Sequence, residues 1–531
     1  MSYAINDRTL IDELCKTLRK TVQCQYEELK TTLEQNGRKL PENFVHPLDE
    51  EIIGKEGADG TEEKTGELAK LLSENEDAIS YSKAGKLDEL WRSLLDKAIV
   101  CLRYFDTREP FLDNPNKAIV AYGIDKLEEY HRRYTEFESL MYGSSAYYRD
   151  HVFHAIRVWM LGVFCLLKAF GDQGMFIEKL SLDGGAEPPD KIGFFEYISM
   201  WTITALCHDL GYPLEKAEQI LDKTRKMMRE FVPSPNVWNN FGYSGTQDSI
   251  NEYVLKFIST KMKEKLPSEE TANQEETGKP AAGEPTEKEY LGRIQPKYYL
   301  KYAKSLESFQ HGIISTIIIY KMLLYFLESD FNLNDDYIYK KEDARQFYIR
   351  REILRAIAAH TCPDAYNIHL TTFSSLLFLC DEFQEWGRRT WNELYTGLKE
   401  DSISLQIEKF SRDEVNIQET INMEGVEDTE IIVQNISRVF ERQFSLYKTT
   451  FRDGQDTAKR DFTLSKTMRF VLPKDGAETR EIILTYGLPK QEASYFTVDL
   501  SNARRERKEY QEKIDKKLFG QMYYSDLKFK P

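Results

Sequence analysis

Five of the eight histidines in this chain lie in strongly apolar segments, where a polar ring is costly to bury without a partner. His208 and Asp209 follow the apolar run Ile198–Leu206 almost directly. A divalent metal would compensate the desolvation of both side chains, because imidazole nitrogens and carboxylate oxygens are good metal ligands. For an isolated pair, a hydrogen-bonded helix end is the better explanation, because such a pair occurs by chance in many chains of this length.

Further polar residues recur in the same apolar context along the chain. His154 opens one apolar segment, His311 and His360 lie in two others, and Asp381 follows Leu379-Cys380. The sequence therefore predicts a metal centre with six ligands, in the order His154, His208, Asp209, His311, His360 and Asp381. His151 lies one turn before His154 and can reach the same helix face, and we favour His154 as the ligand.

This ordered set resembles the HD-domain superfamily of metal-dependent phosphohydrolases over about half of the chain, from Ser145 to Tyr395. The resemblance implies two divalent metal ions, drawn from Mn, Fe, Mg, Ni or Zn. It implies that His154, His208, Asp209 and Asp381 bind one metal, that Asp209 bridges, and that His311 and His360 complete the second. It also leaves a homodimer open.

Such a centre supports hydrolysis at phosphorus. Two metals polarise a phosphoryl oxygen and supply a metal-activated hydroxide for in-line attack. We expect Asp209 to bridge the metals, and His151, Asp150 or Tyr212 to assist the leaving oxygen. These three alternatives stay open in the sequence.

Phosphate recognition needs further groups, and arginine gives bidentate contacts to phosphate. Arg157 lies three residues after His154, and Arg388 lies seven residues after Asp381. We expect these arginines, and Tyr243 in a loop, to contact the substrate. Pairing with a neighbouring carboxylate is the alternative for each arginine.

Two departures from the family leave the substrate open. Many active members read His-Asp-Ile-Gly-Lys, whereas Tyr212 stands at the lysine position here. The deoxynucleotide triphosphohydrolase branch tends to read His-Asp-Ile-Gly-His-Pro, and Tyr212-Pro213 lacks that second histidine. The phosphate contact of the missing lysine is therefore absent or supplied by another residue.

Bulk properties restrict the partners. With 531 residues and a net charge of −16, the chain is poorly suited to bind a nucleic acid polymer, because that affinity comes from neutralising phosphates. A small nucleotide or phosphorylated metabolite is compatible, since the metals supply positive charge locally. Seven cysteines without a CxxC pair predict free thiols in a reducing cytoplasm. No apolar stretch reaches the roughly 20 residues of a membrane span, and we expect a cytoplasmic protein.

The periodicity of apolar residues predicts a mainly α protein in three parts. Residues 1–140 are expected to be a helical extension and residues 141–398 the HD-type helical core. The core carries insertions at about 172–191 and 264–296, and the polar second insertion is either a lid near the site or a solvated loop.

Residues 399–531 are expected to form a small α+β domain, because alternation of apolar and polar residues replaces the helical pattern. The expected strands are Ile403–Phe410, Glu414–Ile421, Met468–Leu472, Glu481–Tyr486 and Ser494–Leu500, and the expected helices are Glu430–Phe451 and Asn502–Leu518.

Three functions are compatible with these features. A metal-dependent phosphohydrolase acting on a small nucleotide, cyclic or a triphosphate, is favoured. A ligand-sensing or regulatory module with weak or no catalysis is the alternative, supported by Tyr212 and by the added domain. A hydrolase of a nucleic acid strand is disfavoured by the acidic charge.

Overall fold

The computed structural model is mostly helical, as the sequence predicts. None of its described helices combines the length and the apolar character that a membrane span requires. The residues described are 3–35, 37–41, 44–49, 52, 54–55, 64–68, 71, 84–108, 120–144, 149–171, 192–231, 246–265, 288–329, 331–334, 336–362, 364, 372–388, 403–410, 414–426, 431–432, 436, 463–475, 478–488, 496–499 and 527–530.

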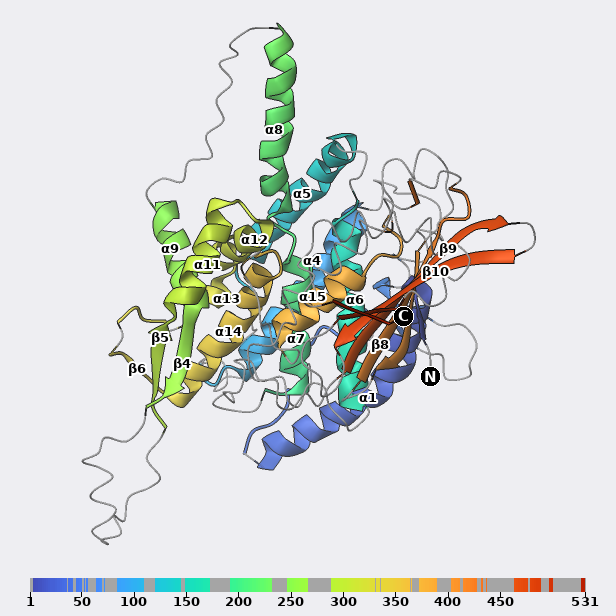
Figure 1. Ribbon diagram of the computed structural model, residues 1–531. Helices are drawn as coiled ribbons and strands as arrows, with labels where there is room; N and C mark the ends of the chain where they lie inside the picture. The colour runs from blue at the N-terminus through green and yellow to red at the C-terminus, as the bar shows by residue number, and fades with distance from the viewer. Residues whose placement is uncertain are drawn as a thin grey trace.

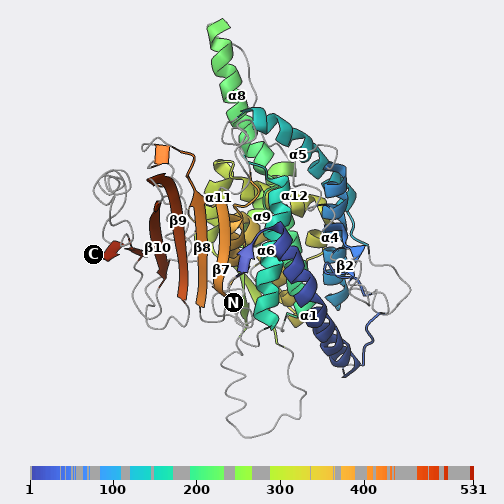
Figure 2. The ribbon, with the colours of Figure 1, turned by 90° about the vertical axis from the view of Figure 1, so that its right-hand side faces the viewer.

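Helices form the body of the molecule, and the longest strands lie together at one side of it (Figures 1 and 2). The helices are α1 (Asp7–Gln35), α4 (Ala84–Phe105), α5 (Ile124–Ser144), α6 (Val152–Gly171), α7 (Phe194–Cys207), α8 (Tyr212–Phe231), α9 (Thr246–Ser259), α11 (Pro296–Glu307), α12 (His311–Met322), α13 (Leu324–Leu327), α14 (Lys341–Ala359) and α15 (Phe373–Phe383). The strands are β1 (Tyr3–Ile5), β2 (Gly54–Lys55), β3 (Lys64–Thr65), β4 (Thr260–Glu264), β5 (Tyr290–Ile294), β6 (Ile338–Tyr339), β7 (Ile403–Phe410), β8 (Glu414–Asn422), β9 (Thr463–Asp475), β10 (Glu478–Leu488), β11 (Phe496–Asp499) and β12 (Leu527–Lys530).

Helix α7 is the centre of the helical body, and all of its residues are buried. A helix that is apolar all round is stable only when other helices surround it, and α4, α6 and α14 pack against α7. Gly162 lets α6 approach closely, because a Cβ there would meet the Trp201 ring at 2.0 Å. The Trp201 indole nitrogen donates to the Trp159 carbonyl at 3.0 Å. This contact sets the spacing of the helices that carry His154 and His208.

The main sheet has the order β1-β7-β8-β9-β10. Strands β7 and β8 pair antiparallel, β8 and β9 pair parallel, and β9 and β10 form an antiparallel hairpin. Strand β7 coincides with its expected bounds, whereas β9 and β10 are longer than expected. The expected helix at 430–451 is described only at 431–432 and 436, and the expected helix at 502–518 lies outside the described residues.

Strand β1 was not expected from the sequence. It pairs antiparallel with β7, with Ile5 opposite Leu405. The first residues of the chain therefore complete a sheet whose other strands come from the last 130 residues. The amino-terminal and carboxy-terminal segments share one structural layer, although the sequence pattern places them in different domains.

The two expected insertions are described only at their edges. Residues 172–191 lie outside the described residues. The second insertion begins and ends in an antiparallel pair, β4 with β5, and β5 also pairs with β6. Strand β6 precedes α14, whereas His360 follows α14, about 29 Å further along a helix of this length. The described edges of this insertion therefore lie towards the end of α14 opposite to His360, and residues 266–287 between them lie outside the described residues.

Candidate metal centre

The six residues selected from the sequence lie at the ends of five helices. His154 is in the first turn of α6, His208 and Asp209 follow α7, and Asp381 is in the last turn of α15. His311 begins α12 and His360 follows α14. Because these five helix ends lie together, residues as far apart in the sequence as His154 and Asp381 meet at one point.

The turn after α7 is held by hydrogen bonds from three surrounding side chains. The Trp91 indole donates to the Leu206 carbonyl at 3.0 Å, and the Tyr130 hydroxyl donates to the Leu210 carbonyl at 2.7 Å. The Ser315 hydroxyl donates to the His208 carbonyl and accepts from the Gly211 amide, both at 2.7 Å. These bonds satisfy backbone groups at the end of α7 and fix the direction of His208 and Asp209.

Two glycines allow α12 to approach the other ligand helices. A Cβ on Gly211 would lie 2.4 Å from the His311 carbonyl oxygen. A Cβ on Gly312 would lie 2.5 Å from the Ile357 carbonyl oxygen and 2.9 Å from His360 Nδ1. The sharp turn before α12 also places Phe309 at a φ of 52°, which is rare for a residue with a side chain.

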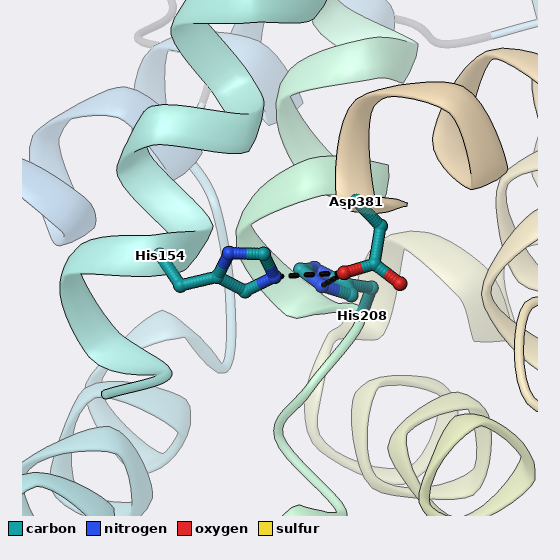
Figure 3. A group of neighbouring side chains, drawn as sticks. All are labelled: His154, His208 and Asp381. Carbon is teal, nitrogen blue, oxygen red and sulfur yellow. Dashed lines mark hydrogen bonds and ion pairs between the residues drawn. The ribbon is translucent and has the colours of Figure 1, made fainter. Parts of the chain in front are cut away.

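The first ligand group contains His154, His208 and Asp381 (Figure 3). His154 Nε2 lies 2.8 Å from Asp381 Oδ1, and His208 Nε2 lies 3.8 Å from the same oxygen. Asp209 Oδ2 faces this group, at 3.3 Å from His208 Nε2 and 3.9 Å from His154 Nε2. Three imidazole and carboxylate ligands that converge in this way can hold a divalent metal.

The second group of candidate ligands lies around Oδ1, the other carboxylate oxygen of Asp209. Asp209 Oδ1 is 3.2 Å from His311 Nε2 and 3.5 Å from His360 Nε2. The two oxygens of Asp209 therefore face two different pairs of histidines. This is the arrangement that a carboxylate needs to bridge two metals.

All four histidines are oriented through their other ring nitrogen. An oxygen acceptor on Nδ1 fixes the tautomer and leaves Nε2 to bind a metal. Nδ1 of His154 pairs with Gln384 Oε1, Nδ1 of His208 with the Ala205 carbonyl at 2.8 Å, Nδ1 of His311 with Glu215 Oε2 at 2.6 Å, and Nδ1 of His360 with the Ile357 carbonyl at 2.6 Å.

The donor set fits a metal because buried nitrogens are left without hydrogen bonds. Nε2 of His208 and Nε2 of His360 have no hydrogen-bond partner among the described residues, although Asp209 lies nearby. A buried polar atom without a partner is costly, and a metal ion would remove that cost for both nitrogens.

The charges of the centre are strongly coupled. Burial opposes ionisation of Asp209, but His208, His311 and His360 outweigh it and hold the pKa of this carboxyl well below its usual range. The pKa of Asp381 is likewise held well below its usual range, against burial, by His154 and His208. Both carboxylates are therefore ionised and ready to bind a cation.

Glu215 gives His311 a different electrostatic environment. Burial opposes protonation of His311, yet hydrogen bonds to Asp209 and Glu215 raise its pKa to about 9. By contrast, burial lowers the pKa of His154 and of His360. A metal at the second group has to displace a proton from His311 before this ring can bind it.

His151 and Tyr212 form one wall of the centre. Their rings stack with centroids 3.8 Å apart, and the Tyr212 ring meets His311 edge-on at 5.2 Å. Burial lowers the pKa of His151 well below its usual range and raises the pKa of Tyr212, so both rings are neutral at neutral pH. Asp150, the third candidate for assisting the leaving group, accepts from the His154 amide at 3.0 Å and so caps α6.

The three expected substrate contacts have different surroundings. Arg157 is engaged within the fold, because its guanidinium pairs with Asp7 and donates to the Gly387 carbonyl at 3.1 Å. This is the carboxylate pairing that the sequence left open. Arg388 lies beside the centre, where Nε donates to the Asp150 carbonyl at 3.2 Å and its charge lowers the pKa of both His151 and His154. Tyr243 lies outside the described residues.

Sequence reasoning missed the residues that orient the ligands. Glu215 and Gln384 hold His311 and His154, and Asp7 anchors the segments next to His154 and Asp381. Glu215 lies in the first turn of α8, where an acidic residue is common for helix-dipole reasons alone. The position of Glu215 in the sequence therefore did not distinguish it from any other acidic residue at the start of a helix.

Comparison with known proteins adds no assignment. No family model, no curated protein and no solved structure matches this chain. The functional argument therefore depends on the geometry of the centre.

Proposed function

We propose that this protein is a metal-dependent phosphohydrolase of the HD type that cleaves a phosphoester or phosphoanhydride bond of a small nucleotide. The proposal is supported above all by the four imidazoles whose Nδ1 atoms are anchored and whose Nε2 atoms converge on Asp209 and Asp381. Buried histidines with a purely structural role need not share this orientation, whereas metal-binding histidines almost always have it.

Two divalent metals fit the donor set. His154, His208, Asp209 and Asp381 would hold one, and Asp209, His311 and His360 would hold the other. When bound, such metals polarise a phosphoryl oxygen and make hydroxide available near neutral pH. The remaining chemistry belongs to the side chains around them.

The side chains beside the centre can bind and orient a phosphorylated substrate. Arg388 places a cation next to the ligands, where it can contact phosphate. Tyr212 keeps its proton and can donate a hydrogen bond to the leaving oxygen, while His151 stacks on its ring and fixes its direction. Of the two ligand carboxylates Asp381 is the more exposed, with 32% of its side chain accessible. We therefore expect the substrate to enter the centre beside Asp381.

The first test is the metal content of the purified protein by plasma mass spectrometry. We expect about two divalent transition metals per chain, lost in His208→Ala, with about one retained in His311→Ala. His46→Ala is the control, because His46 is also buried but packs against Phe44 and Phe195, at the end of α7 opposite to His208. A metal-free protein after loading with Mn or Fe, with both variants folded, contradicts the proposal.

The second test is hydrolysis of a nucleotide panel by the metal-loaded protein, with Asp209→Asn as the inactive variant. Arg388→Ala is expected to raise KM by about tenfold to a hundredfold, the cost of one charged hydrogen bond.

A ligand-sensing role is the alternative. It is favoured by the contact of Lys466, from the carboxy-terminal sheet, with the Phe383 ring near Asp381. Full metal content with nucleotide binding but no hydrolysis would identify that role.

A further inference from the structure

The Arg388 guanidinium is a cation without a countercharge beside the metal centre. Its Nε donates to the Asp150 carbonyl at 3.2 Å. Its two terminal nitrogens have no hydrogen-bond or ion-pair partner among the residues that the structure describes. The side chain is half-buried, and a charge that is partly removed from water is costly without an anionic partner. An anion that enters the centre would supply this partner, because guanidinium groups bind phosphate well.

A second cation, Lys216, is held beside the histidine that begins α12. Its ammonium lies 2.7 Å from Glu215 Oε1, and the other oxygen of Glu215 lies 2.6 Å from His311 Nδ1. The ammonium also lies 4.9 Å from the centre of the Tyr212 ring. An ammonium group has three donors, so the pair with Glu215 leaves donors for a further acceptor. Lys216 is therefore positioned by the fold and can still bind an anion.

The two cations stand on either side of two stacked rings. The His151 and Tyr212 rings stack with centroids 3.8 Å apart, and Asp150, whose carbonyl holds Arg388, directly precedes His151. Since His151 covers one face of the Tyr212 ring, the Lys216 ammonium lies towards the other face. The thickness of two rings therefore separates the cations. Neighbouring phosphates of one chain span this separation better than a single phosphate does.

The centre is accessible beside both ligand groups. In the first group, 32% of the Asp381 side chain is accessible, whereas His208 is fully buried. In the second group, 16% of the His311 side chain is accessible, whereas His360 is almost fully buried. Lys216 borders the second group and has 19% of its side chain accessible. A substrate can therefore extend from the side of Asp381 to the side of Lys216.

We infer that the substrate carries a polyphosphate chain, of which one phosphate lies at the ligand groups beside Arg388 and a neighbouring phosphate is bound by Lys216. This inference rests on the proposed function. It selects a phosphoanhydride, as in a nucleoside diphosphate or triphosphate, over an ester that contains a single phosphate. The additional negative charge of such a chain matches a site where two cationic side chains flank a centre for divalent metals.

Isothermal titration calorimetry tests the inference, with inorganic phosphate and imidodiphosphate as probes of the metal-loaded protein. Imidodiphosphate carries two phosphates on a bridging nitrogen and resists hydrolysis, so the readout is binding and not activity. We expect the wild type to bind imidodiphosphate more tightly than phosphate by about tenfold or more, because one more charged hydrogen bond forms. Metal analysis after each titration checks that the probe has not removed the metal.

The variants separate the two phosphate contacts. In Lys216→Met, the affinity for imidodiphosphate is expected to fall by about tenfold to a hundredfold, the cost of one charged hydrogen bond, while the affinity for phosphate is unchanged. In Arg388→Ala, the affinities for both probes are expected to fall. Lys216→Arg keeps a cation that binds phosphate and is expected to recover most of the affinity.

Lys226→Met is the matched control, because Lys226 lies about 15 Å further along α8 and also pairs with a carboxylate, that of Asp222 at 2.6 Å. It is expected to bind both probes as the wild type does. Equal affinities of the wild type for the two probes, or an equal loss for both in Lys216→Met, would overturn the polyphosphate assignment and leave the proposed function standing. A protein that holds no metal and binds neither probe would contradict the proposed function itself.

Discussion

At the scale of single residues, the candidate centre depends on close approaches as much as on its ligands. His311 and Asp209 come from helices that touch at Gly211, where the nearest atoms leave no room for a side chain. The interior of a protein is packed densely enough that an added methyl group displaces its neighbours. The position of a ligand can therefore be disturbed without removing any ligating atom.

Gly211→Ala is expected to remove about one metal per chain while the protein stays folded. Its Cβ would lie 2.4 Å from the His311 carbonyl oxygen and 2.8 Å from the Ser315 amide nitrogen, so α12 has to move. Overpacking of this kind lowers the free energy of unfolding by about 1–3 kcal/mol. Metal analysis and thermal unfolding measure the two effects. Gly85→Ala is the control, since no atom lies within 4 Å of its added Cβ.

His46 makes stability depend on pH away from the metal centre. Burial lowers the pKa of His46 to about 4, and its Nδ1 accepts from the Leu48 amide at 3.2 Å, which the protonated ring cannot do. Below its ordinary value of 6.5, the unfolded chain binds a proton that the folded chain does not. The contribution of His46 to stability is therefore complete above pH 6.5 and is lost as the pH falls from 6.5 towards about 4.

The corresponding variant is His46→Asn, whose Oδ1 can replace Nδ1 as the acceptor. Denaturant unfolding of the metal-free protein is expected to show that the wild type loses roughly 1.4 kcal/mol per pH unit more than the variant between pH 6.5 and 4. At pH 7.5 the two proteins are expected to differ little. Parallel pH profiles would show that His46 is protonated as readily in the folded chain as in the unfolded one.

At the scale of elements, Asp7 connects the start of α1 to two segments that carry ligands. Its carboxylate accepts from Arg157 on α6, at 2.9 Å to Nη2, and from the Trp386 indole after α15, at 2.7 Å. His154 and Asp381 lie on those same two segments. The contact explains why Arg157 and Trp386 are held within the fold.

Asp7→Asn is expected to lower the free energy of unfolding by about 2 kcal/mol, because the hydrogen bonds of the buried Arg157 to Asp7 lose their charged acceptor. Metal affinity should fall as well, since α6 and α15 lose a common anchor. Asp12→Asn, at an exposed position of the same helix, is the control and should change neither property. Unchanged stability in Asp7→Asn would mean that α1 does not anchor the metal-bearing helices.

The sequence predicted some elements well and others not at all, for physical reasons. Strand β7 and the proximity of the six polar residues could be predicted, because alternation and apolar context are local patterns. Strand β1 could not, since three residues carry no periodicity and their partner β7 lies about 400 positions away. Glu215 and Gln384 were missed because their role depends on which histidine the fold brings to them.

At the scale of the whole molecule, the sheet and the helical body meet at a buried ion pair. Lys466 on β9 lies 2.6 Å from Glu419 on β8, and both side chains are almost fully buried. The Lys466 ammonium also lies 4.7 Å from the centre of the Phe383 ring on α15, the helix that carries Asp381. The sheet therefore contacts α15 through Lys466, and the burial of the Lys466 ammonium requires the negative charge of Glu419.

Removing one member of this pair tests whether the sheet and the helical body unfold together. Lys466→Met removes the ammonium that lies beside the buried Glu419 carboxylate and is expected to cost about 3–5 kcal/mol, whereas Lys466→Met with Glu419→Leu is expected to recover most of that loss. If the two parts form one cooperative unit, calorimetry will show a single transition that moves to lower temperature in Lys466→Met and returns in the double variant. A second, earlier transition in Lys466→Met, with metal still bound above it, would show instead that the sheet unfolds alone. The contact between Lys466 and Phe383 would then not carry stability to the centre.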